Sequence, residues 1–294
     1  DLISESIPEN LELKTKLFQK LEGLVDKKTI ITTNTSGLSL EALSNQMSPK
    51  FQFAAMHFHL GSRLVDIVKG THTNEETIKS IKNFIKTLGC HGIEFKNRNS
   101  SYALNPMLGA LTSQSMLMVI EGKYSIDEID GAWKAINNNN IGPFGIMDML
   151  GLDIINNAWQ EQDKESRLIE YKDKILKFLS PYINRNYLGI KSGKGFLSYP
   201  SIDIGHKKNN YEIIQKDLYI GIIEAALLLL ADNILDKNDI NKVWTIGTSL
   251  KKGPIDILDN MGKENFKKQY KNWVNKEYIS PRSSEIILRL IDTI

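Results

Sequence analysis

Short apolar runs alternate with helical patterns through the first hundred residues. Runs typical of strands, rich in Ile, Val, Phe and Thr, lie at residues 1–7, 28–33, 51–58, 64–68 and 92–95. The segments between them predict helices over residues 11–24, 40–46 and 77–88. Thr73 and Glu76 have the spacing of a capping box for the last of these helices. Strands that alternate with helices predict an α/β fold with a largely parallel sheet.

From residue 100 onward the sequence has helical patterns and no convincing strand. Helices are predicted over residues 104–121, 126–135, 147–160 and 172–179. The pattern then recurs at an offset of 111 residues, which pairs Trp133 with Trp244, Gly142-Pro143 with Gly253-Pro254, Asp148 with Asp259, and Gly151 with Gly262. One fixed offset for these residues indicates an internal duplication. The predicted organisation is an α/β domain at 1–97, a helical domain at 98–204 and a second, degenerate copy at 205–294.

Composition narrows the class of protein. The 294 residues are 41% hydrophobic and 24% charged, as in ordinary globular proteins. A formal charge of +2 argues against nucleic acid or an anionic membrane as the main partner. The longest apolar run, 220–231, contains Glu224 and is too short to span a bilayer. Because the first ten residues are acidic and polar, no signal peptide is predicted.

The single cysteine, Cys90, excludes an internal disulfide. It follows an apolar helical pattern, so a buried structural thiol is expected. A reducing compartment fits this cysteine usage, and a cytoplasmic location is expected.

Polar residues interrupt two of the predicted strands at their carboxyl ends. Ser36 follows the run at 28–33, and His57 lies near the end of the run at 51–58, with Asp66 soon after it. In open parallel α/β sheets, ligands bind beyond the carboxyl ends of the strands. A hydroxyl, an imidazole and a carboxylate are therefore predicted to meet in one crevice. Residue type alone leaves a structural histidine and a turn-capping serine as alternatives.

Seven motifs occur in an order typical of one family. They are PENLELK, NTSGLS, MHFH, LVDIVKG, LNPML, NIGPFGIMDMLGLD and GIKSGKGFLSY. The sequence resembles the L-3-hydroxyacyl-CoA dehydrogenases, in particular the 3-hydroxybutyryl-CoA dehydrogenase type, over residues 1 to about 200. This resemblance implies the C-terminal half of a Rossmann-like NAD-binding domain, followed by all-α domains like the C-terminal domain of 6-phosphogluconate dehydrogenase. Residues 205–294 resemble a second copy of that helical domain.

The resemblance implies an NAD-dependent interconversion of a 3-hydroxyacyl-CoA and a 3-ketoacyl-CoA, in fatty acid or butanoate metabolism. His57 matches the general base, and Asp66 falls at the place of the glutamate that orients it. An imidazole has a pKa suited to this work, and a carboxylate fixes its tautomer. Ser36 and Asn105 match residues that bind the substrate around its carbonyl and thioester.

Four residues match positions that contact the dinucleotide: Glu9, Lys14, Ser36 and Lys191. Outside the resemblance, Glu9 and Lys14 are equally well an ordinary surface pair, and Lys191 an ordinary turn lysine. For Asn105, a helix N-cap is the structural alternative.

The sequence departs from the family pattern in three places. The glycine-rich G-x-G-x-x-G loop that holds the pyrophosphate does not occur in these residues. We therefore expect these residues to be a fragment of a longer protein and, by themselves, to bind NAD poorly or not at all. The pattern HFFNP is replaced by HFHLG at residues 57–61, and the segment up to Asp66 is three residues shorter. Residues 100–102, Ser-Ser-Tyr, stand where the family has Pro-Gly-Phe, and Pro106 replaces an arginine.

Two hypotheses follow. The chain is part of an active dehydrogenase for a 3-hydroxyacyl-CoA or another 3-hydroxy acid, or it is a degenerate member that binds an acyl-CoA or a protein partner without redox turnover. Lys216 lies where the first copy has Asn105, so the second copy is expected to be non-catalytic. A tandem copy predicts a monomeric pseudo-dimer, with a homodimer through the helical domains as the alternative.

Overall fold

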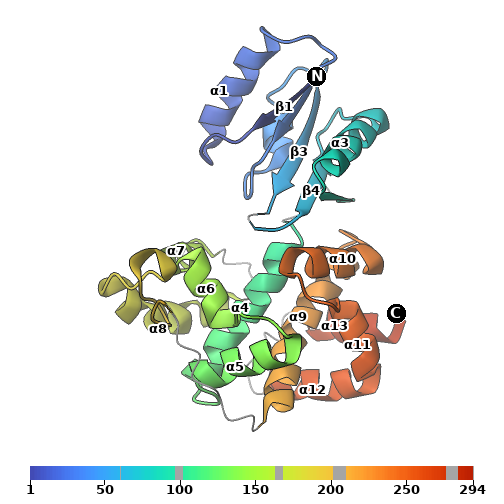
Figure 1. Cartoon of the computed structure of the whole chain (residues 1–294). Helices are drawn as coiled ribbons and strands as arrows, with labels where there is room; N and C mark the ends of the chain where they lie inside the picture. The colour runs from blue at the N-terminus through green and yellow to red at the C-terminus, as the bar shows by residue number, and fades with distance from the viewer. Residues whose placement is uncertain (60, 97–101, 163–167, 201–209, 276–283, 294) are drawn as a thin grey trace. The chain divides into compact units, whose positions relative to one another are not determined.

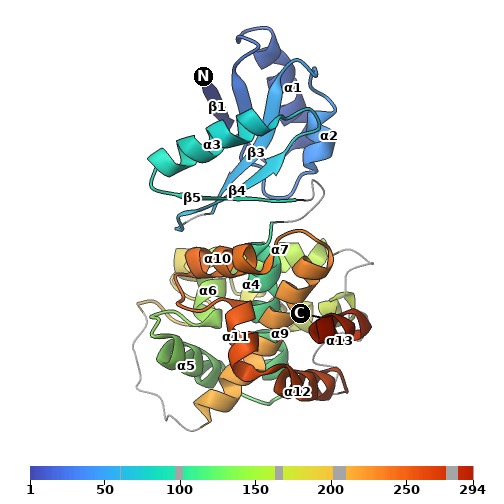
Figure 2. The ribbon, with the colours of Figure 1, turned by 90° about the vertical axis from the view of Figure 1, so that its right-hand side faces the viewer.

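The chain forms two compact units, each made from two segments of sequence. The computed structural model describes residues 1–59, 61–96, 102–162, 168–200, 210–275 and 284–293. Unit 1 comprises Asp1–Pro106 and Leu229–Gly253, and unit 2 comprises Met107–Leu228 and Pro254–Ile294. Figures 1 and 2 show the strands in unit 1 and the helical character of the rest. No helix among the described residues is long and apolar enough to cross a membrane.

Unit 1 contains a five-stranded sheet in the order β1-β2-β3-β4-β5. The strands are β1 (Leu2–Glu5), β2 (Ile30–Thr33), β3 (Gln52–Phe58), β4 (Leu64–Lys69) and β5 (His91–Glu94). Neighbouring strands are parallel from β1 to β3, β4 is antiparallel to β3, and β5 is parallel to β4. The predicted α/β architecture is confirmed. The carboxyl ends of β1, β2 and β3 therefore share one edge of the sheet.

Helices cover both faces of this sheet. Helices α1 (Leu11–Glu22) and α2 (Leu40–Ser44) lie on one face and α3 (Glu75–Thr87) on the other, as Figures 1 and 2 show. Successive strand residues point to opposite faces. Phe53 of β3 accordingly meets Phe18 of α1, with ring centroids 5.0 Å apart, whereas Ala54 belongs to the cluster around the isoleucines of α3.

A late segment of sequence completes unit 1. Helix α10 (Lys237–Thr248) contacts β4 and β5. The Lys96 amide donates to the Ile234 carbonyl at 3.1 Å, and the Ser62 hydroxyl donates to the Ile246 carbonyl at 3.3 Å. Residues that lie more than a hundred positions after the sheet are thus part of the same compact unit.

The remaining elements are helical. They are α4 (Leu104–Ile120), α5 (Ile126–Asn137), α6 (Pro143–Leu150), α7 (Leu152–Gln160), α8 (Lys172–Asn184), α9 (Tyr211–Ala231), α11 (Pro254–Met261), α12 (Lys263–Asn275) and α13 (Ser284–Thr293), with short 3-10 turns at Ile169–Tyr171 and Ile190–Ser192. Helices α10, α11 and α12 begin 111 residues after α5, α6 and α7. Trp133 of α5 and Trp244 of α10, which the offset pairs, are both buried.

Helices α4 and α9 lie side by side in unit 2 (Figures 1 and 2). The Gln114 side chain of α4 joins them, because its amide donates to the Asp217 carbonyl at 2.7 Å and its oxygen accepts from the Gly221 amide at 2.9 Å. Both hydrogen bonds are buried, which favours one register of α4 against α9.

Three local predictions are wrong. Residues 147–160 form two helices, because Gly151 between α6 and α7 has a φ of 102°, outside the helical region. Helix α3 begins one residue after Asn74, whose side chain accepts from the Thr77 amide, so Thr73 is not its N-cap. Cys90 is half-buried rather than buried, and its Sγ lies 3.8 Å from the Leu88 carbonyl.

A buried carboxylate of α5 caps the start of α6. The Phe144 and Gly145 amides donate to the two oxygens of Asp130 at 2.8 and 3.1 Å. Burial raises the pKa of Asp130 to about 6, and these hydrogen bonds only partly oppose it. Asn241 lies against Gly253 as Asp130 lies against Gly142, and in both places a Cβ on the glycine would overlap the side chain.

Replacing Asp130 with asparagine should change how stability depends on pH. The pKa of Asp130 is near 3.8 in the unfolded chain and about 6 in the folded protein. Between these two pH values the folded protein therefore binds the Asp130 proton more tightly than the unfolded chain does. Relative to Asp130→Asn, the wild-type protein should therefore gain stability as the pH falls from 7 to 4, by at most about 3 kcal/mol. Urea unfolding at each pH measures the difference. Parallel pH curves for the two proteins would contradict the effect.

Candidate active site

The β3–β4 hairpin brings two histidines to one aspartate. The antiparallel register places His57 directly opposite Asp66, and opposed residues of such a pair point to the same face. The Nδ1 atom of His57 lies 3.3 Å from Oδ2 of Asp66. His59 follows two residues later, and its Nε2 lies 2.6 Å from the same Oδ2. Asp66 is fully buried, and its Oδ2 contacts both imidazoles.

The shared carboxylate orients the His57 ring. An ionised aspartate only accepts hydrogen bonds, so the Nδ1 atom that faces it carries the hydrogen. The basic lone pair of a neutral His57 is then on Nε2. Among the described residues no group forms a hydrogen bond with this atom. The geometry leaves one basic nitrogen of His57 available to a ligand.

Tyr102 stacks on the His57 ring, with centroids 4.1 Å apart and planes 12° from parallel. Its hydroxyl donates to the Thr35 carbonyl at 2.5 Å. Burial, with the negative charges of Asp66 and Glu9, raises the pKa of Tyr102, so the phenol stays neutral. Tyr102 was not among the predicted site residues. The signal for it was its position in place of the phenylalanine in the family pattern.

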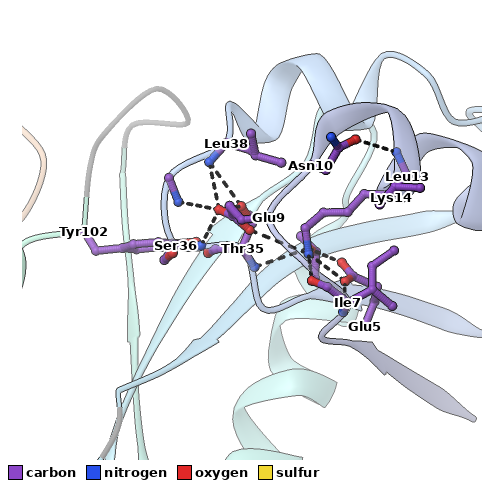
Figure 3. A network of polar contacts seen from close by, with 12 residues as sticks. Glu5, Ile7, Glu9, Asn10, Leu13, Lys14, Thr35, Ser36, Leu38 and Tyr102 are labelled. Carbon is purple, nitrogen blue, oxygen red and sulfur yellow. Dashed lines mark hydrogen bonds and ion pairs between the residues drawn. The ribbon is translucent and has the colours of Figure 1, made fainter. Parts of the chain in front are cut away.

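The turn after β2 is organised around the Glu9 carboxylate (Figure 3). Its Oε1 accepts from the Thr35 hydroxyl at 2.5 Å and from the amides of Ser36, Gly37 and Leu38 at 3.0, 2.8 and 3.2 Å. Burial raises the pKa of Glu9, but these four hydrogen bonds outweigh it and the pKa is lowered. Glu9 therefore holds this turn as a carboxylate.

Lys14 lies behind that turn and is almost completely buried. Its Nζ is 2.6 Å from Oε1 of Glu5, 3.0 Å from the Ile7 carbonyl and 3.7 Å from Oε2 of Glu9. Figure 3 draws Lys14 among these residues. The alternative of an ordinary surface pair between Glu9 and Lys14 is wrong, since Lys14 has little exposed surface. Its predicted contact with a dinucleotide stays a prediction.

Among the described residues, no hydrogen bond joins Ser36, Asn105 or Lys191 to His57 or Asp66. Ser36 is exposed, and its hydroxyl makes no hydrogen bond within the described part of the chain. Asn105 is exposed and is the second residue of α4, so it does not cap that helix. Lys191 belongs to unit 2, where its Nζ pairs with both carboxylate oxygens of Asp153 at 2.5 and 2.7 Å. The structure thus brings His57 and Asp66 together and leaves Ser36 and Asn105 accessible.

The β2 turn is also tied to the histidine strand. The Phe58 amide, next to His57, donates to the Asn34 side chain at 2.8 Å. This bond fixes the residues that follow β2 relative to the end of β3, at the edge where parallel strands present ligand-binding residues.

Comparisons with known proteins identify the family of this chain. The family "3-hydroxyacyl-CoA dehydrogenase, NAD binding domain" matches residues 1–98, and "3-hydroxyacyl-CoA dehydrogenase, C-terminal domain" matches residues 102–199. The hydroxyacyl-coenzyme A dehydrogenase of Sus scrofa mitochondria is 32% identical over 205 residues, which are 68% of this chain. The chain spans 64% of the length of that relative.

Solved structures extend the likeness. The (S)-3-hydroxybutyryl-CoA dehydrogenase of Ralstonia eutropha is 28% identical, with a TM-score of 0.58 over 68% of this chain and 71% of its own. The 3-hydroxybutyryl-CoA dehydrogenase of Escherichia coli has a TM-score of 0.80 over 99% of this chain and 82% of its own, and at 16% identity it shows the fold alone. Since the NAD-binding and C-terminal matches follow one another through residue 199, the chain belongs to the 3-hydroxyacyl-CoA dehydrogenase family of NAD-dependent oxidoreductases.

Proposed function

We propose that this chain supplies the catalytic base of an NAD-dependent dehydrogenase that interconverts a 3-hydroxyacyl-CoA and its 3-ketoacyl-CoA. One observation carries the proposal: His57 is held by the buried Asp66 through Nδ1, and its Nε2 has no hydrogen-bond partner among the described residues. A four-carbon substrate, 3-hydroxybutyryl-CoA, is supported by the name of the 28% identical Ralstonia eutropha relative.

The proposed chemistry assigns one task to each side chain. In the direction of oxidation, Nε2 of His57 takes the proton of the substrate hydroxyl, and Asp66 stabilises the imidazolium that forms. Tyr102 keeps the His57 ring in place by stacking. Ser36 and Asn105 are proposed to bind the substrate carbonyl and thioester. NAD, when bound, supplies the hydride acceptor, and the protein provides placement.

The residues of the chain fit one end of the dinucleotide. The exposed Ser36 lies after β2 at the ligand-binding edge of the sheet, in the turn that Glu9 holds, so this turn would hold the nicotinamide end. The buried Lys14 is committed to Glu5 and offers little to a ligand. The sequence has no glycine-rich loop for the pyrophosphate. Weak NADH binding by these 294 residues is therefore expected.

The first test is oxidation of NADH in the presence of acetoacetyl-CoA, with NADH raised to millimolar concentration. Turnover with a high KM for NADH is expected. Calorimetry with acetoacetyl-CoA gives the second measurement. A folded protein that neither oxidises NADH nor binds the acyl-CoA would contradict the proposal.

A binding role without redox turnover is the second candidate. The altered HFHLG segment favours it, because Asp66 lies closer to His59 (2.6 Å) than to His57 (3.3 Å). Acyl-CoA binding with no NADH oxidation would support this role. Turnover with a different 3-hydroxy acid would instead change only the proposed substrate and keep the dehydrogenase activity.

We further propose that residues 205–294 are a second copy of the helical domain and replace a partner subunit. The common 111-residue spacing of helix starts supports this, as do the matched contacts of Asp130 with Gly142 and of Asn241 with Gly253. Sedimentation should then give a monomer of about the chain mass, 33.3 kDa. A tight dimer would favour the alternative, pairing through the helical domains.

A further inference from the structure

The carboxylate of Asp66 is buried with its two oxygens unequally satisfied. Oδ2 faces His57 and His59, whereas Oδ1 has no hydrogen-bond partner in the described part of the chain. No lysine or arginine among the described residues forms an ion pair with Asp66. A buried carboxylate is costly unless a cation or several hydrogen bonds compensate it. A cation bound next to the Asp66 carboxylate would therefore be stabilised.

Three side-chain atoms around Asp66 lie close enough together to ligate one metal ion. One nitrogen each of His57 and His59 and one oxygen of Asp66 lie within 4.8 Å of one another. Zinc binds imidazole nitrogen and carboxylate oxygen at about 2.0–2.2 Å, so ligand atoms on one ion are no more than about 4 Å apart. Small side-chain rotations would bring these three atoms to that spacing.

The hairpin holds these ligands in one place. His57 and Asp66 are directly opposed in the β3–β4 register, and His59 follows on the same face. The shortened segment between the strands closes with the His59 amide donating to the Leu64 carbonyl at 3.3 Å. Two histidines and one carboxylate, with a position left for water, form a donor set typical of zinc.

We propose that His57, His59 and Asp66 bind one divalent transition-metal ion of the zinc class. The ion binds Nδ1 of His57 and supplies a positive charge next to the buried Asp66 carboxylate. His59 is the ligand that distinguishes this chain, because the family pattern HFFNP has a phenylalanine there. In one respect the inference rests on the proposed function: an ion on Nδ1 removes the hydrogen bond that orients His57, so the metal-bound protein is an inactive form.

The test is metal titration of the whole chain in a Cys90→Ser background. This background is needed because Cys90 is half-buried and the adjacent His91 is exposed, so these two side chains could bind zinc on their own. After removal of metal with a chelator, zinc is titrated by competition with a chromogenic chelator, and cobalt(II) is titrated by its visible spectrum. One ion per chain is expected, with the intense visible bands of four-coordinate cobalt.

His59→Phe should weaken zinc binding at least about tenfold, since loss of even an outer-sphere partner has effects of that order. His72→Asn is the matched control, because His72 is an exposed histidine outside the cluster, and it should bind zinc like the parent. Circular dichroism checks that each variant is folded, and His59→Gln replaces His59→Phe if the latter is not. Absence of one-to-one binding, or equal affinity in the folded His59 variant, would overturn the metal site.

The titration needs neither NAD nor an acyl-CoA, so it can succeed where the proposed dehydrogenase activity fails. If the protein turns over, zinc should inhibit the parent and His72→Asn over the concentration range that fills the site. The turnover that His59→Phe retains should resist the same zinc concentrations. Inhibition that is equal in all three proteins would place the inhibitory ion elsewhere and overturn the link to His57.

Discussion

His57→Gln is expected to lower the rate of NADH oxidation with acetoacetyl-CoA by about 100- to 10,000-fold, the range in which a positioned general base or acid contributes. The amide of glutamine cannot take up or return the substrate proton at Nε2. Steady-state kinetics should show the loss in kcat, with acyl-CoA affinity little changed, because His57 acts on the reacting proton rather than on the bulk of the substrate.

Two variants sharpen this result. Asp66→Asn keeps the size of the side chain but removes the charge that stabilises the His57 imidazolium, so it should also lower kcat. His72→Asn replaces an exposed histidine and should leave kcat unchanged. Wild-type turnover in His57→Gln would show that the base is elsewhere. It would also remove the main support for the proposed mechanism.

Lys14→Ala is expected to destabilise the protein by about 3–5 kcal/mol, the range for removing one partner of a buried ion pair. The side chains of Lys14 and Glu5 are 2% and 1% exposed, and their charged atoms are 2.6 Å apart. Without the ammonium group, the Glu5 carboxylate remains in the interior with no cation beside it. Urea unfolding measures the loss.

The same helix provides a control. Lys16 forms a 2.6 Å ion pair with Glu12, but these side chains are 67% and 76% exposed. Lys16→Ala should therefore cost less than about 1 kcal/mol. If Lys14→Ala left stability unchanged and weakened only NADH binding, the Lys14–Glu5 ion pair would contribute little to stability. The predicted dinucleotide contact of Lys14 would then gain support.

The α/β part of the fold was predictable because its signals are local. Each strand had its own apolar run, and the predicted bounds differ from the observed ones by one or two residues in β2, β3 and β4. The helix predicted over 147–160 failed because the apolar periodicity continues across Gly151. Periodicity reports which face is buried, whereas the break depends on the φ of a single residue.

The site was predictable only in part. The resemblance pointed to His57 and Asp66, and their contact follows from the β3–β4 register. The shared role of Asp66 depends on how the shortened hairpin closes, which residue types do not reveal. The burial of Lys14 was equally hidden, because lysine is nearly always exposed and its partner Glu5 is in a different element.

The interleaving of the two units has a consequence for synthesis of the chain. Helix α10 belongs with the sheet, although it follows α4 to α9 in sequence. A ribosome therefore releases all five strands long before the helix that completes their unit, so this unit cannot be finished until residue 253 has emerged. A cleavage at residue 204, between the two predicted helical copies, would likewise leave the sheet and α10 on different fragments, and α4 to α8 on a different fragment from the later helices of unit 2. Neither unit would keep all of its parts on one side of the cut.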